Sequence, residues 1–137
     1  MNQQTVRVLL IEDCPDYAGV VHDWLSALAD EESAGFDLVW RQSLGEGLER
    51  VRDGGIDLVL LDRGLPDCPG CSLAAFRAAF PATPVIMLTG VESELDATRL
   101  LEDGAVDYLV KHICDAKTLR GAIWDFVENP ERIRVVR

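Results

Sequence analysis

The chain has 137 residues, 48% of them hydrophobic, and its formal net charge at pH 7 is −11. This length suits a single domain with a hydrophobic core of its own. The negative charge disfavours a nucleic-acid or anionic membrane surface, since both attract basic footprints. No apolar run approaches the roughly 20 residues of a membrane span, and the first residues do not resemble a signal peptide. We therefore expect a cytoplasmic protein whose four cysteines are reduced thiols.

Apolar runs and helix signals alternate along the chain. Five apolar runs predict strands at 5–11, 36–42, 56–61, 84–89 and 106–110. Helices are expected from Pro15, at about 43–53, 72–80 and 92–103, and after Asp115 as the capping residue. This alternation predicts an α/β fold with a doubly wound, five-stranded parallel sheet and five helices. The predicted domain spans 1–129, and 130–137 form a short C-terminal tail.

Polar residues stand where four of the five predicted strands end. Glu12 and Asp13 follow the first strand, Asp62 the third, Thr89 the fourth and Lys111 the fifth. Ligands of doubly wound sheets bind at these carboxyl ends, where the order of the strands reverses. We therefore expect the candidate site at this edge of the sheet.

The chemistry of these side chains narrows the function. Three carboxylates about 5 Å apart would repel by about 3 kcal/mol per pair at an effective dielectric near 20. Either one of them stays protonated or a cation lies among them, and hard oxygen donors suit Mg²⁺ or Mn²⁺. A carboxylate beside a cation, the Lys111 ammonium and the Thr89 hydroxyl can attack a phosphoryl group. Asp62, at the end of an apolar strand, is the candidate nucleophile.

The motifs "VLLIED", "DLVLLDRGLPDCPG", "PVIMLTG" and "GAVDYLVK" are similar to those of response regulator receiver domains, the CheY-like family of bacterial two-component systems. The resemblance covers about residues 5–128. It implies a sheet in the order 2-1-3-4-5. It also implies a signalling switch, not an enzyme, that takes a phosphoryl group and assists its own phosphorylation and dephosphorylation. The implied donor is a histidine kinase or a phosphotransfer protein.

The resemblance also implies a role for each site residue. Asp62 would be the phosphoacceptor. Glu12, Asp13, Asp62 and the backbone carbonyl of Gly64 would hold the metal. Thr89 and Lys111 would contact the phosphoryl group, and Tyr108 would turn inward as Thr89 moves.

The chain departs from the common family pattern in three places: at Arg63 after Asp62, in the turn from Cys68 to Cys71, and directly after Lys111. A proline with a cis peptide usually follows the lysine, but His112 stands there. Because a cis bond without proline costs about 2.5–4 kcal/mol, we expect a trans bond and a reshaped loop.

Three other functions are compatible with parts of this pattern. An FMN-binding flavodoxin would need a Ser/Thr/Gly-rich first loop, where this chain has "EDCPD". A haloacid-dehalogenase-like phosphohydrolase would need an acid two residues after its nucleophile, where Gly64 stands. A receiver-like protein that no longer takes phosphate would not need the complete set of site residues. The phosphoacceptor function is therefore the prediction.

The predicted output passes to a downstream protein partner, or to a second copy of the chain, through the face formed by the fourth helix, the fifth strand and the fifth helix. Direct contact with nucleic acid is not expected. Lys117, Arg120 and Trp124 lie near one side of the last helix, and a tryptophan there can pack internally or anchor a partner.

Cys68 and Cys71 belong to no receiver motif. They can be ordinary reduced residues of a turn. Alternatively, they form a redox pair whose disulfide would stiffen the loop that carries Gly64.

Overall fold

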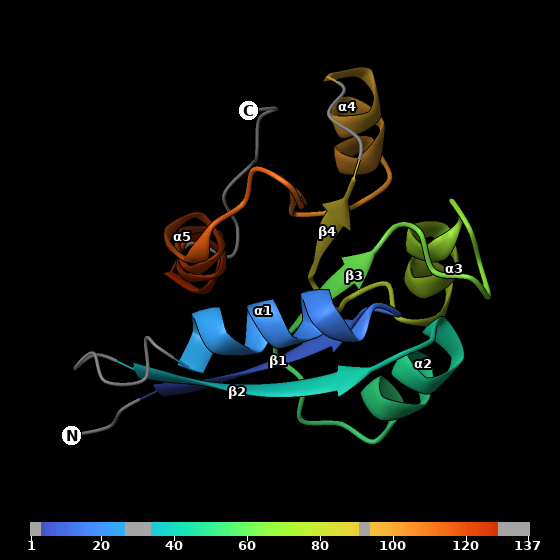
Figure 1. Cartoon of the computed structure of the whole chain (residues 1–137). Helices are drawn as coiled ribbons and strands as arrows, with labels where there is room; N and C mark the ends of the chain where they lie inside the picture. Colours follow the sequence, from blue (N-terminus) through green and yellow to red (C-terminus); the bar gives the residue numbers. More distant parts are fainter. Residues whose placement is uncertain (1–3, 27–33, 91–93, 129–137) are drawn as a thin grey trace.

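The chain folds into a five-stranded parallel sheet with helices on both faces (Figure 1). The structure is a computed structural model that describes residues 4–26, 34–90 and 94–128. The strands are β1 (Gln4–Ile11), β2 (Ala34–Arg41), β3 (Leu58–Asp62), β4 (Val85–Thr89) and β5 (Asp107–Val110). The helices are α1 (Pro15–Ser26), α2 (Leu44–Arg52), α3 (Ser72–Ala79), α4 (Glu94–Glu102) and α5 (Ala116–Glu128). The strand order β2-β1-β3-β4-β5 confirms the predicted fold.

Alternate residues of the central strands pack into two hydrophobic clusters, one on each face of the sheet. Leu58 and Leu60 of β3 join a cluster with α1 and α5. Val59 and Leu61 join a second cluster with α2, α3 and α4. This explains the continuous apolar run of β3, because a strand covered on both faces has no solvent-facing side. The sheet is thus covered by apolar packing on both faces, so polar side chains stand at the ends of its strands.

Helix α2 begins at the predicted cap. Ser43 is its N-cap residue, and the Ser43 hydroxyl accepts a hydrogen bond from the Glu46 amide at 3.1 Å. The second half of the capping box differs from the usual pattern, because the Glu46 carboxylate accepts from the Gln42 amide at 3.3 Å. Asp67 completes the cap from outside: its carboxylate accepts from the amides of Leu44 and Gly45, both at 3.1 Å. The loop after β3 is thereby fixed to the start of α2.

The region around α5 also agrees with the sequence. Asp115 caps this helix by accepting a hydrogen bond from the Thr118 amide at 2.8 Å. The peptide between Lys111 and His112 is trans, as predicted, since the described residues contain no cis peptide bond.

Within the described ranges, no helix combines the length and apolar character that a membrane span requires. The predicted boundary at residue 129 lies outside the described residues and stays a prediction.

Candidate functional site

The parallel register brings the candidate residues to one edge of the sheet. Ile11 of β1 lies beside Leu61 of β3, so the residues that follow each of them come close together. On the other side of β3, Asp62 lies beside Leu88 of β4. The Lys111 amide donates to the backbone carbonyl of Thr89 at 2.8 Å, which carries the pairing of β4 and β5 to the same edge.

A cavity of about 510 Å³ opens at this edge. Its lining includes all the predicted metal- and phosphoryl-binding residues except Tyr108. The lining residues are Glu12, Asp13, Cys14, Asp62, Arg63, Gly64, Gly70, Thr89, Gly90 and Lys111. We call this cavity the acidic pocket.

Three carboxylates form the floor of the acidic pocket. One oxygen from each of Glu12, Asp13 and Asp62 lies within 4.8 Å of the others. Glu12 is fully buried and Asp62 is 4% exposed, while Asp13 is the most accessible of the three. Buried carboxylates this close together repel one another strongly, so the cluster favours a cation among them.

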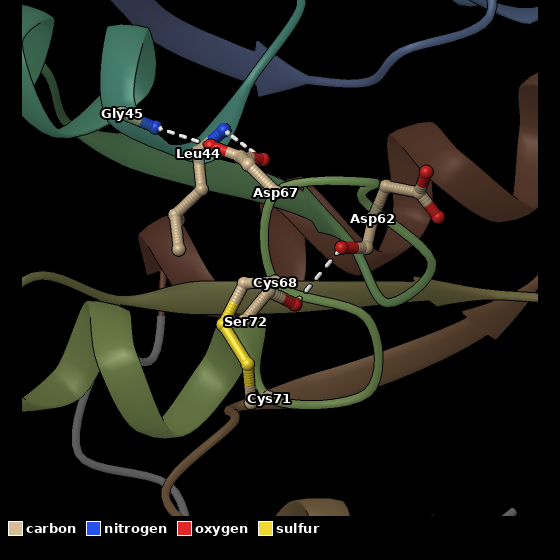
Figure 2. The surroundings of a disulfide bond; sticks show 7 residues. All are labelled: Leu44, Gly45, Asp62, Asp67, Cys68, Cys71 and Ser72. Atoms are coloured by element: carbon tan, nitrogen blue, oxygen red, sulfur yellow. Dashed lines mark hydrogen bonds between the residues drawn. A yellow bond between two sulfur atoms is a disulfide. The ribbon is translucent and has the colours of Figure 1, made fainter.

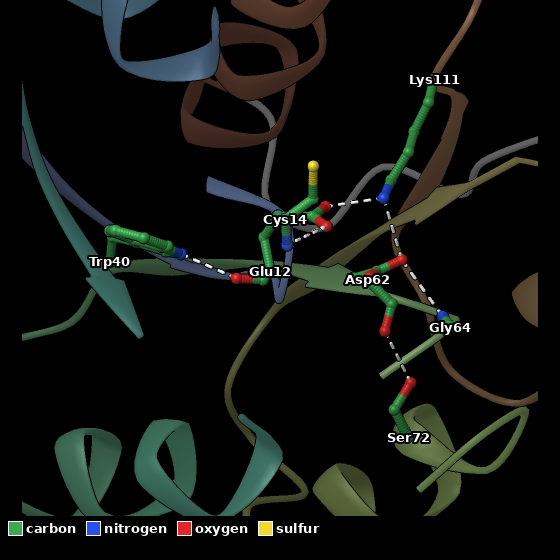
Figure 3. Close-up of polar contacts among 7 residues, drawn as sticks. All are labelled: Glu12, Cys14, Trp40, Asp62, Gly64, Ser72 and Lys111. Carbon is green, nitrogen blue, oxygen red and sulfur yellow. Dashed lines mark hydrogen bonds and ion pairs between the residues drawn. The ribbon is translucent and has the colours of Figure 1, made fainter. Parts of the chain in front are cut away.

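Lys111 supplies positive charge to this cluster (Figure 3). Its ammonium nitrogen lies 2.7 Å from Glu12 Oε1 and 3.2 Å from Asp62 Oδ1. The same Asp62 oxygen accepts a hydrogen bond from the Gly64 amide at 3.1 Å. The ring of Tyr17 lies below the ammonium, with 4.9 Å between the nitrogen and the ring centroid. Lys111 is thus held between two carboxylates and an aromatic face.

Burial and charge shift the pKa values in this cluster. Burial lowers the pKa of Lys111, but contacts with Glu12 and Asp62 raise it by more, so its pKa is raised overall. Burial raises the pKa of Glu12, Lys111 lowers it, and Asp62 raises it again, so its pKa is also raised. The Lys111 ammonium stays charged because two carboxylates stabilise it, whereas burial destabilises the carboxylate of Glu12.

Sequence reasoning missed Trp40, because the second predicted strand ends at Gln42 with Ser43 after it, and neither residue indicates a catalytic or binding role. The Trp40 indole N–H donates to the backbone carbonyl of Glu12 at 2.7 Å (Figure 3). The Glu12 amide in turn donates to the carbonyl of Arg41 at 3.0 Å. Both backbone groups of Glu12 are therefore held by the end of β2. The sequence signal for this contact is a tryptophan near the carboxyl end of the edge strand, because the tryptophan side chain is long enough to reach the neighbouring loop.

Thr89 and Tyr108 lie at different depths. Thr89 is 2% exposed and lines the acidic pocket. Tyr108 lies beside Met87 of the neighbouring strand and is partly buried against the cluster formed with α2, α3 and α4. The structure therefore brings Thr89 into the pocket and leaves Tyr108 outside it.

The four cysteines are not all thiols in the structure. Cys68 and Cys71 form a disulfide in the loop after β3, with 5.4 Å between their Cα atoms (Figure 2). For these two residues the expectation of reduced thiols is wrong here, because the turn brings them within bonding distance. Cys14 and Cys114 are free thiols. Burial, with the charge of Asp115 as a second cause, raises the pKa of Cys114 to about 11.

The three residues singled out on the last helix differ in environment. Lys117 is exposed and Arg120 is partly exposed. Trp124 packs inward, with its ring centroid 5.4 Å from that of Phe36 in β2. Trp124 therefore has an intramolecular partner on the side of α5 that faces the sheet, and its role as an anchor for a second protein stays a prediction.

A doubly wound sheet with a carboxylate triad, a hydroxyl and a lysine at the carboxyl ends of its strands defines the receiver class of α/β proteins. The comparison with protein families agrees: residues 8–123 match the response regulator receiver domain. The chain belongs to this family, whose members are signalling switches of two-component systems.

Curated relatives of the chain are longer proteins. The swarming motility regulation protein RssB of Serratia marcescens is 40% identical over 81 residues, which cover 58% of this chain and 37% of RssB. The DNA-binding response regulator MtrA of Mycolicibacterium smegmatis is 32% identical over 111 residues, 81% of this chain and 46% of MtrA. The chain therefore spans less than half the length of these two relatives.

Solved structures show the same fold. A response regulator receiver domain protein from Clostridium thermocellum superposes with a TM-score of 0.77 at 25% identity, covering 92% of this chain and 97% of that one. A CheY-like receiver domain from Methanospirillum hungatei gives a TM-score of 0.77 at 24% identity and covers 93% of this chain and 98% of that one. The second likeness supports the fold alone.

Proposed function

We propose that the chain is the phosphoacceptor of a two-component phosphorelay, with Asp62 as the residue that takes the phosphoryl group. The observation that supports this most directly is the setting of Asp62. Its carboxylate is almost fully buried at the end of β3, 3.2 Å from the Lys111 ammonium and beside two further carboxylates. A buried acid with a cation on one side and acids on the other is arranged for attack on a negatively charged phosphoryl group.

The donor set fits Mg²⁺ or Mn²⁺. The side chains of Glu12, Asp13 and Asp62 offer clustered hard oxygens. Burial, and after it the charge of Asp62, raises the pKa of Glu12, and a cation in the cluster would offset both effects. These residues, with the backbone carbonyl of Gly64, are the ligands we propose. When bound, the cation would neutralise charge that develops on the phosphoryl oxygens.

The contacts of Asp62 suggest how its two oxygens divide their roles. Lys111 and the Gly64 amide both contact Oδ1, so we assign Oδ2 as the attacking atom. Its lone pair forms the new bond to phosphorus while the phosphorus–nitrogen bond of a phosphohistidine breaks. The released electron pair returns to the donor imidazole, which takes up a proton from solvent. Lys111 then stabilises the transferred group, and Thr89 donates a hydrogen bond to it.

The output face proposed for this switch is α4-β5-α5, with Thr89 and Tyr108 as its link to the acidic pocket. Ile113, in the loop between β5 and α5, is 58% exposed. It borders a hollow of about 200 Å³ that Tyr108 and Val110 also line. An exposed apolar side chain beside a hollow supports a contact surface for a downstream protein or a second copy of the chain. The charge of −11 supports protein contacts over direct contact of this domain with nucleic acid. The cytoplasm, where histidine kinases deliver phosphoryl groups, is the location we propose.

The proposal is tested by incubation with acetyl phosphate and Mg²⁺, followed by intact mass spectrometry. We expect one added phosphoryl group in the parent, none in Asp62→Asn, and none in the parent when the cation is chelated. Asp53→Asn, at the end of α2 and remote from the pocket, is the matched control and should be labelled like the parent. Equal labelling of Asp62→Asn would show that another residue is the acceptor.

A second experiment tests the output face. Sedimentation velocity of the phosphorylated parent should show a shift toward dimer, and Ile113→Asp should reduce that shift while leaving the thermal midpoint unchanged. The side chain is mostly exposed, so the substitution removes apolar contact area without opening the core. A dimer that forms equally well with Ile113→Asp would place the contact elsewhere.

A further inference from the structure

The loop between β3 and α3 holds a disulfide next to the candidate phosphoacceptor. Cys68 and Cys71 close a ring of four residues that includes Pro69 and Gly70 (Figure 2). Gly70 has a φ of 74°, a left-handed conformation that suits glycine. It also lines the acidic pocket. The disulfide therefore constrains a segment that forms part of the wall of the pocket.

Hydrogen bonds connect this ring to the backbone around Asp62. The Gly70 amide donates to the carbonyl of Arg63 at 3.2 Å. The Ser72 hydroxyl donates to the carbonyl of Asp62 at 3.0 Å, and Ser72 is buried. Gly64, whose amide contacts the Asp62 carboxylate, directly follows the two residues whose carbonyls are anchored in this way. A change in the stiffness of the ring can therefore reach the backbone directly before Gly64 through these two hydrogen bonds.

The loop is also fixed at Asp67, directly before Cys68, by contacts that do not involve the disulfide. Asp67 accepts hydrogen bonds from the first amides of α2. Burial raises the pKa of its carboxyl, but these hydrogen bonds together lower it by more, so its pKa is lowered overall. Reduction of the disulfide would leave this contact in place. The part of the loop that gains freedom is therefore 68–71, the part that faces the pocket.

We propose that Cys68 and Cys71 are a redox-controlled dithiol–disulfide pair that sets the affinity of the acidic pocket for its divalent cation. The proposal adds a second input to the switch, independent of the phosphoryl donor. In a reducing compartment a disulfide of this kind is regulatory and transient, not a permanent structural link.

The environments of the two sulfurs assign their roles. Cys71 is exposed and is the N-cap residue of α3, where the helix dipole favours a thiolate. Cys68 is partly buried against the cluster formed with α2 and α3. Cys71 is therefore the attacking thiolate and Cys68 the resolving one.

Oxidation requires a low-molecular-weight disulfide such as oxidised glutathione. The Cys71 thiolate attacks one sulfur of this oxidant, a mixed disulfide forms, and one glutathione thiolate leaves. The Cys68 thiolate then attacks the Cys71 sulfur and expels the second glutathione. Two protein thiols lose two electrons and two protons, and the oxidant is reduced to two glutathione thiols.

The direction of the effect follows from preorganisation. In the oxidised form the ring is fixed before the cation binds, whereas in the reduced form binding must also order 68–71. A segment that is ordered beforehand removes part of the ordering cost of binding. We expect Mg²⁺ to bind the oxidised protein about threefold more tightly than the reduced protein, and the Gly64 amide to exchange with solvent more slowly in the oxidised form.

The experiment uses the full chain in glutathione buffers that keep it oxidised or reduced. Free thiols are counted, Mg²⁺ affinity is measured by calorimetry, and exchange of the Gly64 amide is followed by NMR. The double variant Cys68→Ser/Cys71→Ser keeps Cys14 and Cys114 and is the matched control. It should bind Mg²⁺ like the reduced parent in both buffers. These readouts do not depend on phosphorylation, so they are separate from the test of the phosphoacceptor.

The proposal is supported if the parent loses two free thiols in oxidised glutathione and binds Mg²⁺ more tightly there than in the reduced buffer, while the double variant binds Mg²⁺ equally in both buffers. Three results would overturn it: four free thiols in both buffers, equal Mg²⁺ affinity in the two redox forms, or the same redox response in the double variant. The last result would assign the effect to Cys14 or Cys114.

Discussion

Trp40 offers a specific test of how the acidic pocket is held. Its indole N–H donates to the backbone carbonyl of Glu12, the residue that begins the carboxylate triad. Trp40→Phe removes this donor and keeps an aromatic ring at the edge of the sheet. Trp40 is 37% exposed, so the loss of packing is modest and water can reach the freed carbonyl.

The expected magnitudes follow from this single hydrogen bond. A hydrogen bond of this kind contributes about 1 kcal/mol net, so the free energy of unfolding should fall by about that amount. If the whole contribution is used to order Glu12 for cation binding, Mg²⁺ affinity falls by at most about fivefold, since about 1.4 kcal/mol corresponds to tenfold. We expect a decrease between twofold and fivefold, as a rough range under that limit.

Isothermal titration calorimetry with Mg²⁺ and urea unfolding would measure the two quantities. Trp124→Phe is the matched control, because it makes the same substitution at a residue that packs on Phe36 and does not line the acidic pocket. It should lower stability without changing Mg²⁺ affinity. If Trp40→Phe binds Mg²⁺ like the parent, or if Trp124→Phe weakens binding equally, the contact with Glu12 does not position the triad.

Two further predictions concern pH and packing. The folded-state pKa of Glu12 is raised, so its contribution to stability is present below the unfolded pKa and is lost as pH rises through the folded pKa. Without Mg²⁺, Glu12→Gln should therefore become more stable relative to the parent as pH rises above 4.5, the ordinary pKa value for glutamate, and urea unfolding at a series of pH values would measure this. A stability difference that does not change with pH would show that burial does not destabilise the Glu12 carboxylate. Gly47→Ala should lower the free energy of unfolding by about 1–3 kcal/mol, because a Cβ there meets the side chain of buried Ile11. Gly19→Ala, in α1 with open space around it, should instead stabilise the chain by about 0.5–1 kcal/mol, and equal effects of the two substitutions would contradict this packing argument.

The fold followed from the sequence because its signals are local and mutually consistent. Apolar runs such as 56–61 are long enough to require cover on both faces, and the caps Ser43 and Asp115 fix helix starts as predicted. The acids, Thr89 and Lys111 could be found because each directly follows or ends a strand, and a parallel sheet gathers such positions at one edge.

Contacts between segments far apart in the chain could not be predicted from the sequence. Trp40 lies 28 positions from Glu12, and Asp67 lies 23 from Leu44. Neither pairing has a spacing that predicts it, since each depends on the direction of a side chain in the folded loop. The disulfide could be predicted only as one of two alternatives, because the spacing of Cys68 and Cys71 permits a bond between them without requiring it.

The division of the core into two clusters has a consequence for how the molecule can be modified. The disulfide loop, α2 and α3 lie over one cluster, whereas α1 and α5 lie over the other, with the sheet between them. Substitutions in Leu73 on one side and Leu119 on the other share no packing partner in these clusters, so their effects on stability should add. The two faces can therefore diversify separately, each acquiring its own binding partners, while the strand ends at the acidic pocket remain the place where both meet.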